Sequence, residues 1–130
     1  MSAPQTIALG ALSALLAVAT GAFGAHGLAA RLAPRFLEIW KTGAHYHLVH
    51  SLALVAVGIW LSGTSLEGFP ASLARAAAGA FTFGIVVFSG SLYLLALTEI
   101  RWLGAITPIG GLGMMAGWGL MAAAALWGTR

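Results

Sequence analysis

Long apolar stretches dominate the chain and alternate with short polar connections. There are four, at about residues 6–30, 44–61, 71–97 and 108–127. A helix needs about 20 mostly apolar residues to cross the hydrocarbon core of a bilayer. The pattern therefore predicts an all-α membrane protein, a single domain over residues 1–130, whose four transmembrane helices form an up-down-up-down bundle.

The starts of two stretches carry local signals. No Lys or Arg precedes the first stretch, whereas a cleaved signal peptide normally begins with a basic segment. We therefore expect the first stretch to remain as a span. Thr107 and Pro108 are expected to open the fourth span, because a threonine cap followed by proline favours a helix start.

The connection between the first two stretches, residues 34–43, has a helical period of its own. Its apolar Phe36, Ile39 and Trp40 fall on one face, and its charged residues fall on another. This pattern predicts a short amphipathic helix lying in the membrane interface, with Trp40 at the level of the lipid headgroups. The alternative is an ordinary loop with a single helical turn.

Composition supports a lipid-facing surface. Of the 130 residues, 60% are hydrophobic and 7% are charged, whereas soluble domains carry about a quarter charged residues. The chain has no cysteine, which excludes disulfides, thiolate metal sites and cysteine nucleophiles. Its six basic residues are scattered singly, so we expect no nucleic-acid partner.

The basic residues also predict an orientation in the membrane. Four of them lie near the first and third connections: Arg31, Arg35, Lys41 and Arg101. Arg75 and Arg130 lie on the opposite side. Cytoplasmic loops are enriched in Lys and Arg, so the first and third connections are expected to be cytoplasmic and both termini to face outward.

Small residues recur at three- and four-residue steps along the first, third and fourth stretches. Such stripes allow transmembrane helices to approach closely. The positions singled out for helix packing are Gly21, Gly84, Gly113 and Gly117. The stripes are explained either by packing within the bundle or by the interface of a homo-oligomer.

Several polar residues are expected at the cytoplasmic ends of the spans. The candidate polar cluster comprises His26, Tyr46, His47, His50 and Glu99. Three explanations remain open: anchoring at the interface, a buried hydrogen-bond network, or a metal or proton site. The zinc signature HExxH is absent from the sequence, and we predict no metal, no cofactor and no catalytic residue.

A second group of polar residues interrupts the third stretch near its middle. Ser89, Ser91 and Tyr93 lie there among apolar neighbours. Serine hydroxyls bond to a neighbouring helix or to their own backbone, so interhelical packing is the simpler explanation and a substrate site the alternative. The sequence contains neither a GxSxG elbow nor a phosphate-binding loop.

Four motifs are spread along the chain in a fixed order, from Gly21 to Trp118. They are GAFGAHGL (21–28), YHLVHSLAL (46–54), FSGSLYLLALT (88–98) and ITPIGGLGMMAGW (106–118). Together they resemble the bacterial family called domain of unknown function 423, which is related to the transmembrane protein 256 family. The resemblance implies a small bacterial inner-membrane protein with about four spans, and it implies no activity. Ala25 with His26 matches the Ala-His pair of that family's first motif, and Tyr46 with His50 matches the Tyr and His that stand four apart in its second.

Three functional hypotheses follow. The first is a non-enzymatic membrane component that acts in the bilayer as a homo-oligomer or as a subunit of a larger complex. The second is a channel or carrier for a proton, ion or small solute, which would need an oligomer because four spans leave little room for a pore. The third is metal or haem binding through histidine, and a lipid-modifying enzyme without a recognisable motif is a further alternative.

Overall fold

The computed structural model describes residues 1–63 and 66–128, in which all regular structure is helical. The elements are α1 (Ala3–Phe23), η1 (Gly24–Leu28), α2 (Pro34–Gly63), α3 (Gly68–Gly84), η2 (Ile85–Ser89), α4 (Gly90–Thr98) and α5 (Leu103–Gly128). The two η segments are single π-helical turns within longer helices. Four continuous helices result, each long and apolar enough to cross a membrane. The all-α fold and the four predicted spans are thus confirmed.

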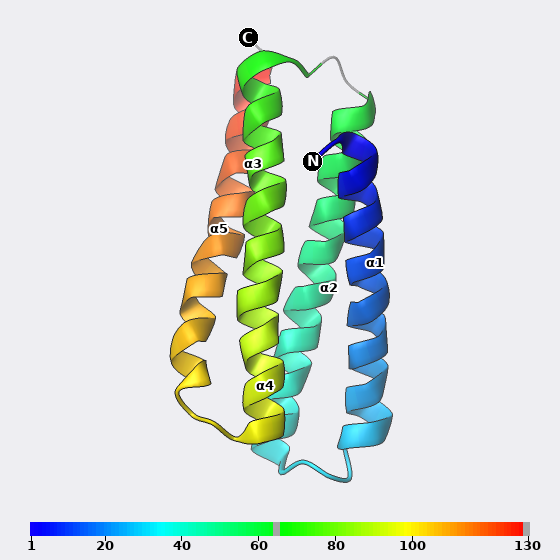
Figure 1. Ribbon diagram of the computed structural model, residues 1–130, viewed down its shortest axis with the longest axis vertical. Coiled ribbons are helices and arrows are strands. Elements are labelled where there is room, and N and C mark those ends of the chain that lie inside the picture. Colours follow the sequence, from blue (N-terminus) through cyan, green and yellow to red (C-terminus); the bar gives the residue numbers. More distant parts are fainter. Residues whose placement is uncertain (64–65, 129–130) are drawn as a thin grey trace.

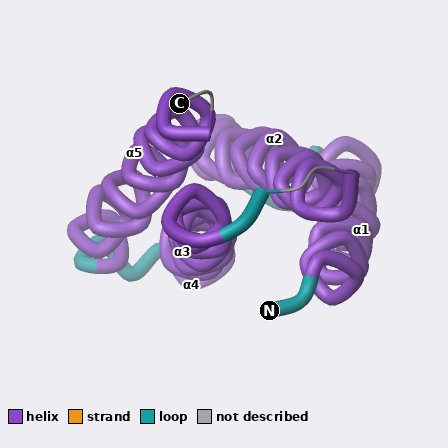
Figure 2. The backbone as a smooth tube through the Cα atoms, turned by 90° about the horizontal axis from the view of Figure 1, so that it is seen from above, coloured by secondary structure: helices purple, strands orange, loops and turns teal. Residues whose placement is uncertain are grey.

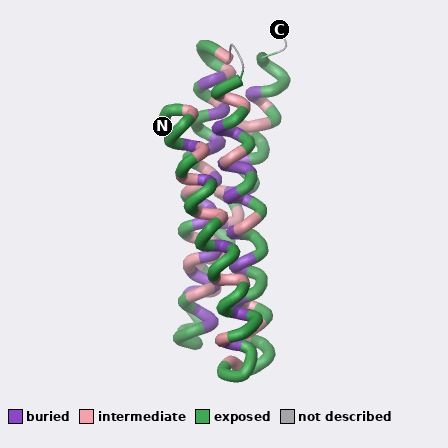
Figure 3. Tube along the Cα trace, turned by 90° about the vertical axis from the view of Figure 1, so that its right-hand side faces the viewer, coloured by how far each residue is buried: buried purple, intermediate pink, exposed green. Residues whose placement is uncertain are grey.

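Successive long helices run in opposite directions, and both marked chain ends lie at the same end of the molecule (Figure 1). Seen along the helices, α1 and α5 occupy opposite sides (Figure 2). The main partner of α1 is α2, and the main partner of α5 is α3. The two inner spans are consequently more buried than the two outer ones, and exposed residues follow the outside of the molecule along its length (Figure 3).

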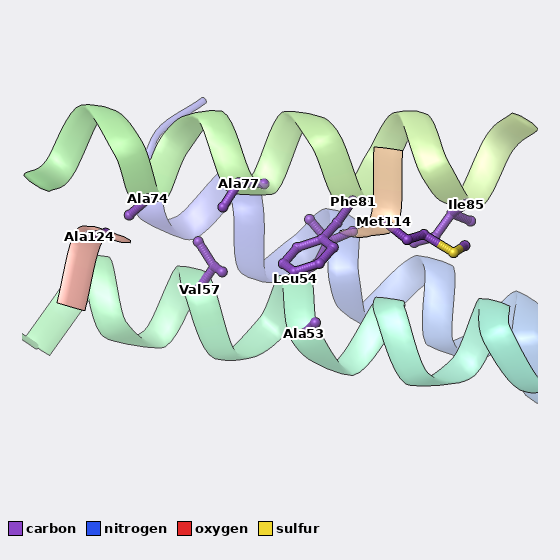
Figure 4. Close-up of a cluster of buried hydrophobic side chains, with 10 residues drawn as sticks. Ala53, Leu54, Val57, Ala74, Ala77, Phe81, Ile85, Met114 and Ala124 are labelled. Atoms are coloured by element: carbon purple, nitrogen blue, oxygen red, sulfur yellow. The ribbon is translucent and has the colours of Figure 1, made fainter. Parts of the chain in front are cut away.

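The core lies between α2, α3 and α5. Its buried apolar side chains include Leu54 and Val57 of α2, Phe81 of α3 and Met114 of α5 (Figure 4). Phe81 has no exposed surface. Alanines on α3 keep the helices close around it, because a small side chain lets neighbouring backbones approach.

Residues 34–43 are helical but do not form the separate interfacial helix that we predicted. They are the first turns of α2, which continues without a break to Gly63. Trp40 is 5% exposed, packed against other helices instead of facing lipid, and its indole N–H donates to the Thr20 carbonyl at 2.8 Å. The apolar face of residues 34–43 packs inside the bundle. The segment therefore continues directly into the second span as one helix.

The fourth span begins earlier than predicted, at Leu103, and Pro108 lies inside α5. A left-handed Glu99, with φ of 58°, ends α4. Two tight turns follow, in which Leu103 N donates to Ile100 O and Gly104 N donates to Arg101 O. These turns start the helix before the proline, which then removes only one backbone hydrogen bond near the helix end.

The glycines singled out for packing fall into two groups. A Cβ atom at Gly84 would lie 2.5 Å from Met114 Cγ, and one at Gly117 would lie 2.5 Å from Phe81 Cδ1. Gly113 is similarly close, at 2.7 Å from Phe83 Cδ1. These three glycines therefore lie at the contact of α3 with α5. Gly21 differs, because a Cβ there would meet no atom within 4 Å.

Candidate functional site

The polar side chains inside the spans form separate groups on different sides of α2. The largest group, called here the Tyr93 network, comprises Ser13, Thr20, His47, Ser51 and Tyr93. Its members come from α1, α2 and α4. The network therefore links an outer helix to both inner spans.

His47 is at the centre of the Tyr93 network. Its Nε2 atom lies 3.1 Å from Ser13 Oγ, and its Nδ1 atom lies 3.1 Å from the Tyr93 hydroxyl. The Tyr93 hydroxyl lies 2.9 Å from Thr20 Oγ1, and Ser13 Oγ lies 2.7 Å from Ser51 Oγ. Five side chains are thus joined by four hydrogen bonds. A buried polar group must find such partners in an apolar medium.

Trp40 packs against Tyr93 at one end of this network. Its ring centroid lies 4.5 Å from that of Tyr93, and its N–H donates to the carbonyl of Thr20. The ring fits there because residue 24 is glycine: a Cβ at Gly24 would lie 2.5 Å from Trp40 Cδ1. Gly24 begins the π-helical turn of α1, so the local widening of that helix coincides with the indole contact.

His50 belongs to a second group, on the side of α2 that faces α5. The indole N–H of Trp118 donates to His50 Nε2 at 3.2 Å, and His50 Nδ1 lies 2.7 Å from the carbonyl oxygen of Tyr46. An indole nitrogen only donates, and a carbonyl oxygen only accepts. The two partners therefore fix His50 as a neutral imidazole with its proton on Nδ1.

The serines near the middle of the third span have different surroundings. Ser91 Oγ lies 2.8 Å from Thr107 Oγ1, which links α4 to α5. Ser89 is 1% exposed, and its Oγ is the only buried side-chain N or O atom without a hydrogen-bond partner among the described residues. Ser89 ends the π-helical segment η2.

The structure does not bring the five residues of the predicted cluster together. His47 and His50 are buried but take part in different groups, and Tyr46 is 42% exposed. His26 and Glu99 are exposed at the helix ends. Within residues 1–63 and 66–128, no side-chain hydrogen bond or ion pair joins His26 or Glu99 to the other three.

Sequence reasoning missed several partners of the two buried histidines. Ser13 and Thr20 were not singled out, although a separation of seven residues places both on one helix face. Trp118 was considered only as part of a motif. In the described part of the chain, no group of three His, Cys, Asp or Glu side chains is placed to hold a metal ion.

Two of the grooves beside α2 are lined by the polar residues described above. The α1 groove, between α1 and the η2–α4 segment, has a volume of about 410 Å³. Its lining includes Leu12, His47, Ser89 and Tyr93. The α5 groove has a volume of about 730 Å³ and is lined by side chains of α2, η2 and α5, including Trp118. Both volumes are in the range of small-molecule sites.

Comparisons with known proteins agree with this architecture. The family described as "Protein of unknown function (DUF423)" matches residues 20–111. A UPF0382 membrane protein of Staphylococcus saprophyticus is 49% identical over 112 residues, which cover 86% of this chain and 88% of the relative. The UPF0382 membrane protein YwdK of Bacillus subtilis is 46% identical over 121 residues, which cover 92% and 94%.

No solved structure matches the chain. The family match covers more than two thirds of the chain, including η1, all of α2, Ser89 and Ser91. The relatives are bacterial membrane proteins by name and align over nearly their full lengths. The chain therefore belongs to the DUF423 family, as a small membrane protein with four helices able to span a bilayer.

Proposed function

We propose that the chain is a non-enzymatic component of the bacterial inner membrane that acts by lateral assembly, as a homo-oligomer or as a subunit of a larger complex. The observation that carries this proposal is the outward face of α5. Leu112 and Met115 on this face are 65% and 70% exposed, and both border the α5 groove. One turn further along, a Cβ at Gly119 would meet no atom within 4 Å.

A face of this kind suits helix–helix contact in a bilayer. Transmembrane helices associate by close packing around small residues, since apolar side chains gain little by leaving lipid. Gly119 and the exposed Ala122 lie three residues apart on the same face. The internal α3 and α5 contact uses Gly113 and Gly117 instead, so the outward small residues remain available to another helix.

The chain has no cysteine, so single-cysteine crosslinking in native membranes can test assembly directly. We expect Met115→Cys to form a disulfide-linked dimer or a crosslink to one partner subunit. Ile59→Cys is the matched control, because Ile59 is also an apolar residue, 58% exposed, on a different helix. Absence of any crosslink at Met115, together with a monomeric purified protein, would contradict the proposal.

Proton transfer, the second candidate function, is supported by the Tyr93 network. Hydroxyl and imidazole groups can both accept and donate hydrogen bonds, and ionisable groups inside membrane helices are typical of proton paths. The chain of hydrogen bonds from Ser51 to Thr20 has no charged member. It is therefore suited to protons rather than to larger ions.

Reconstituted liposomes with an entrapped pH-sensitive dye test this second function. Wild-type protein should admit protons under an imposed membrane potential, and His47→Phe should abolish the flux because it removes the central link. His50→Phe is the control, since His50 lies outside the Tyr93 network. Equal flux in wild type and His47→Phe, or no flux in wild type, would exclude conduction through this network.

A further inference from the structure

Ser89 differs from the other hydroxyl residues of the inner spans. Ser51, Ser62 and Thr82 each donate to the backbone carbonyl four residues earlier, at 2.7, 2.9 and 2.8 Å. This bond is the usual way for a helix to satisfy a hydroxyl inside a membrane. Ser89 Oγ has no such bond and no other partner within residues 1–63 and 66–128.

The π-helical turn explains the difference at Ser89. Residues Ile85–Ser89 form a turn in which backbone bonding shifts from the fourth to the fifth preceding residue. The carbonyl that a serine would use in a regular helix is thereby displaced. π-helical turns are frequent at functional sites, and an unsatisfied buried hydroxyl is costly. The hydroxyl therefore needs a partner from outside the chain.

Ser89 is one of the residues that line the α1 groove, together with His47 and Tyr93, and it is 1% exposed, so a ligand must part its neighbours to reach the hydroxyl. The apolar rim of the groove includes Leu12 and Val86, which are 61% and 67% exposed. A molecule dissolved in the bilayer can therefore enter from the side. No Asp, Glu, Lys or Arg lines the groove, which excludes a strongly charged ligand because its charge would lack a counter-charge.

The depth of Ser89 further restricts the ligand. Nine helical residues, Gly90–Thr98, follow it to the end of the span, which places it roughly 13 Å from that end. The whole span has 31 residues and is roughly 46 Å long, whereas the hydrocarbon core is about 30 Å thick. A core centred on the span leaves roughly 8 Å of helix beyond each face and places Ser89 inside the hydrocarbon, where few neutral groups accept a hydrogen bond.

We propose that the α1 groove binds a neutral, lipid-soluble carbonyl compound of the quinone type, whose carbonyl oxygen accepts a hydrogen bond from Ser89. A carbonyl oxygen satisfies the serine without bringing a donor of its own, and a bare acyl chain would leave Ser89 unsatisfied. The donors of His47 and Tyr93 are already engaged with each other and with Ser13 and Thr20. The ester carbonyl of a phospholipid is the other group in a bilayer that offers such a carbonyl acceptor to Ser89.

The test uses full-length protein in nanodiscs of ether-linked phospholipid, which has no ester carbonyl, and menadione labelled with ¹³C at its carbonyl carbons. We expect saturable binding and an infrared carbonyl band shifted to lower frequency. Ser89→Ala should lose the shift and weaken binding about fivefold, as for loss of one neutral hydrogen bond. Ser91→Ala is the matched control and should bind as wild type, because its hydroxyl is bonded to Thr107.

A second arm uses nanodiscs of ester-linked phospholipid without menadione. A Ser89-dependent shift of the ester band there would support the carbonyl site and assign it to phospholipid. The proposal is overturned if neither arm shows a shift that depends on Ser89, or if Val86→Cys crosslinks two copies through the groove. It is also overturned if Ser89→Ala unfolds more readily than Ser91→Ala, because Ser89 would then have a partner within the fold.

Discussion

His47 Nδ1 lies 3.1 Å from the hydroxyl of Tyr93, so that one imidazole of α2 connects α4 to α1 through its two ring nitrogens. The α1 helix has little other contact with the third span. His47 therefore joins α1, α2 and α4 through side-chain hydrogen bonds, whereas the Trp118–His50 bond separately links α5 to α2. The hydroxyl of Tyr93 has two partners, His47 and Thr20.

Tyr93→Phe is expected to destabilise the protein by about 1–2 kcal/mol, because it removes one hydroxyl and leaves two partners without their hydrogen bond. The measurement is the free energy of unfolding in mild detergent. Tyr46→Phe is the control, since the Tyr46 hydroxyl makes no hydrogen bond within the described residues and its side chain is exposed. Equal stability of the two variants would contradict the role given to the Tyr93 hydroxyl.

Gly110→Ala should disrupt the contact of η2 with α5. A Cβ at this position would overlap the backbone of Phe88, and backbone cannot move aside as a flexible side chain can. We expect a loss of about 1–3 kcal/mol in the free energy of unfolding. Gly119→Ala, on the same helix with no atom within 4 Å of its Cβ, should change stability by less than about 1 kcal/mol, towards greater stability. A reversed order of the two variants would refute the packing described here.

His50 is expected to carry its proton on Nδ1, because Nε2 accepts from Trp118 and Nδ1 faces a carbonyl oxygen. Nitrogen-15 NMR of ¹⁵N-histidine-labelled protein distinguishes the two tautomers, and a His50→Gln variant assigns the signal. In Trp118→Phe, the Nε2 resonance should move because it loses its donor. A wild-type His50 protonated on Nε2 would show that the indole contact is not a hydrogen bond.

Both termini are proposed to face outward, because Arg31, Arg35, Lys41 and Arg101 lie near the two connections at the opposite end of the molecule. Arg130, which counts against this bias, lies outside the described residues. Reporters active only outside the cytoplasm should be active at either terminus and inactive within residues 29–33. Cytoplasmic activity at both termini would reverse the proposed orientation.

The sequence determined the four spans, because hydropathy and length are local properties that need no knowledge of neighbours. It also identified the third span as polar near its middle, at Ser89, Ser91 and Tyr93. The predicted starts of the second and fourth spans were wrong: the second helix begins at Pro34 and the fourth at Leu103. The Trp40 segment looked interfacial because its amphipathic period is the same whether the apolar face meets lipid headgroups or another helix.

Only the tertiary structure decided which polar side chains meet. His47 and His50 share a helix and differ by three positions, yet one bonds to Ser13 and Tyr93 and the other to Trp118. A partner depends on the rotation and register of the neighbouring helix, and spacing along one helix does not specify these. The same reason applies to Ser89: a π-helical turn and the shape of the α1 groove together leave its hydroxyl without a partner.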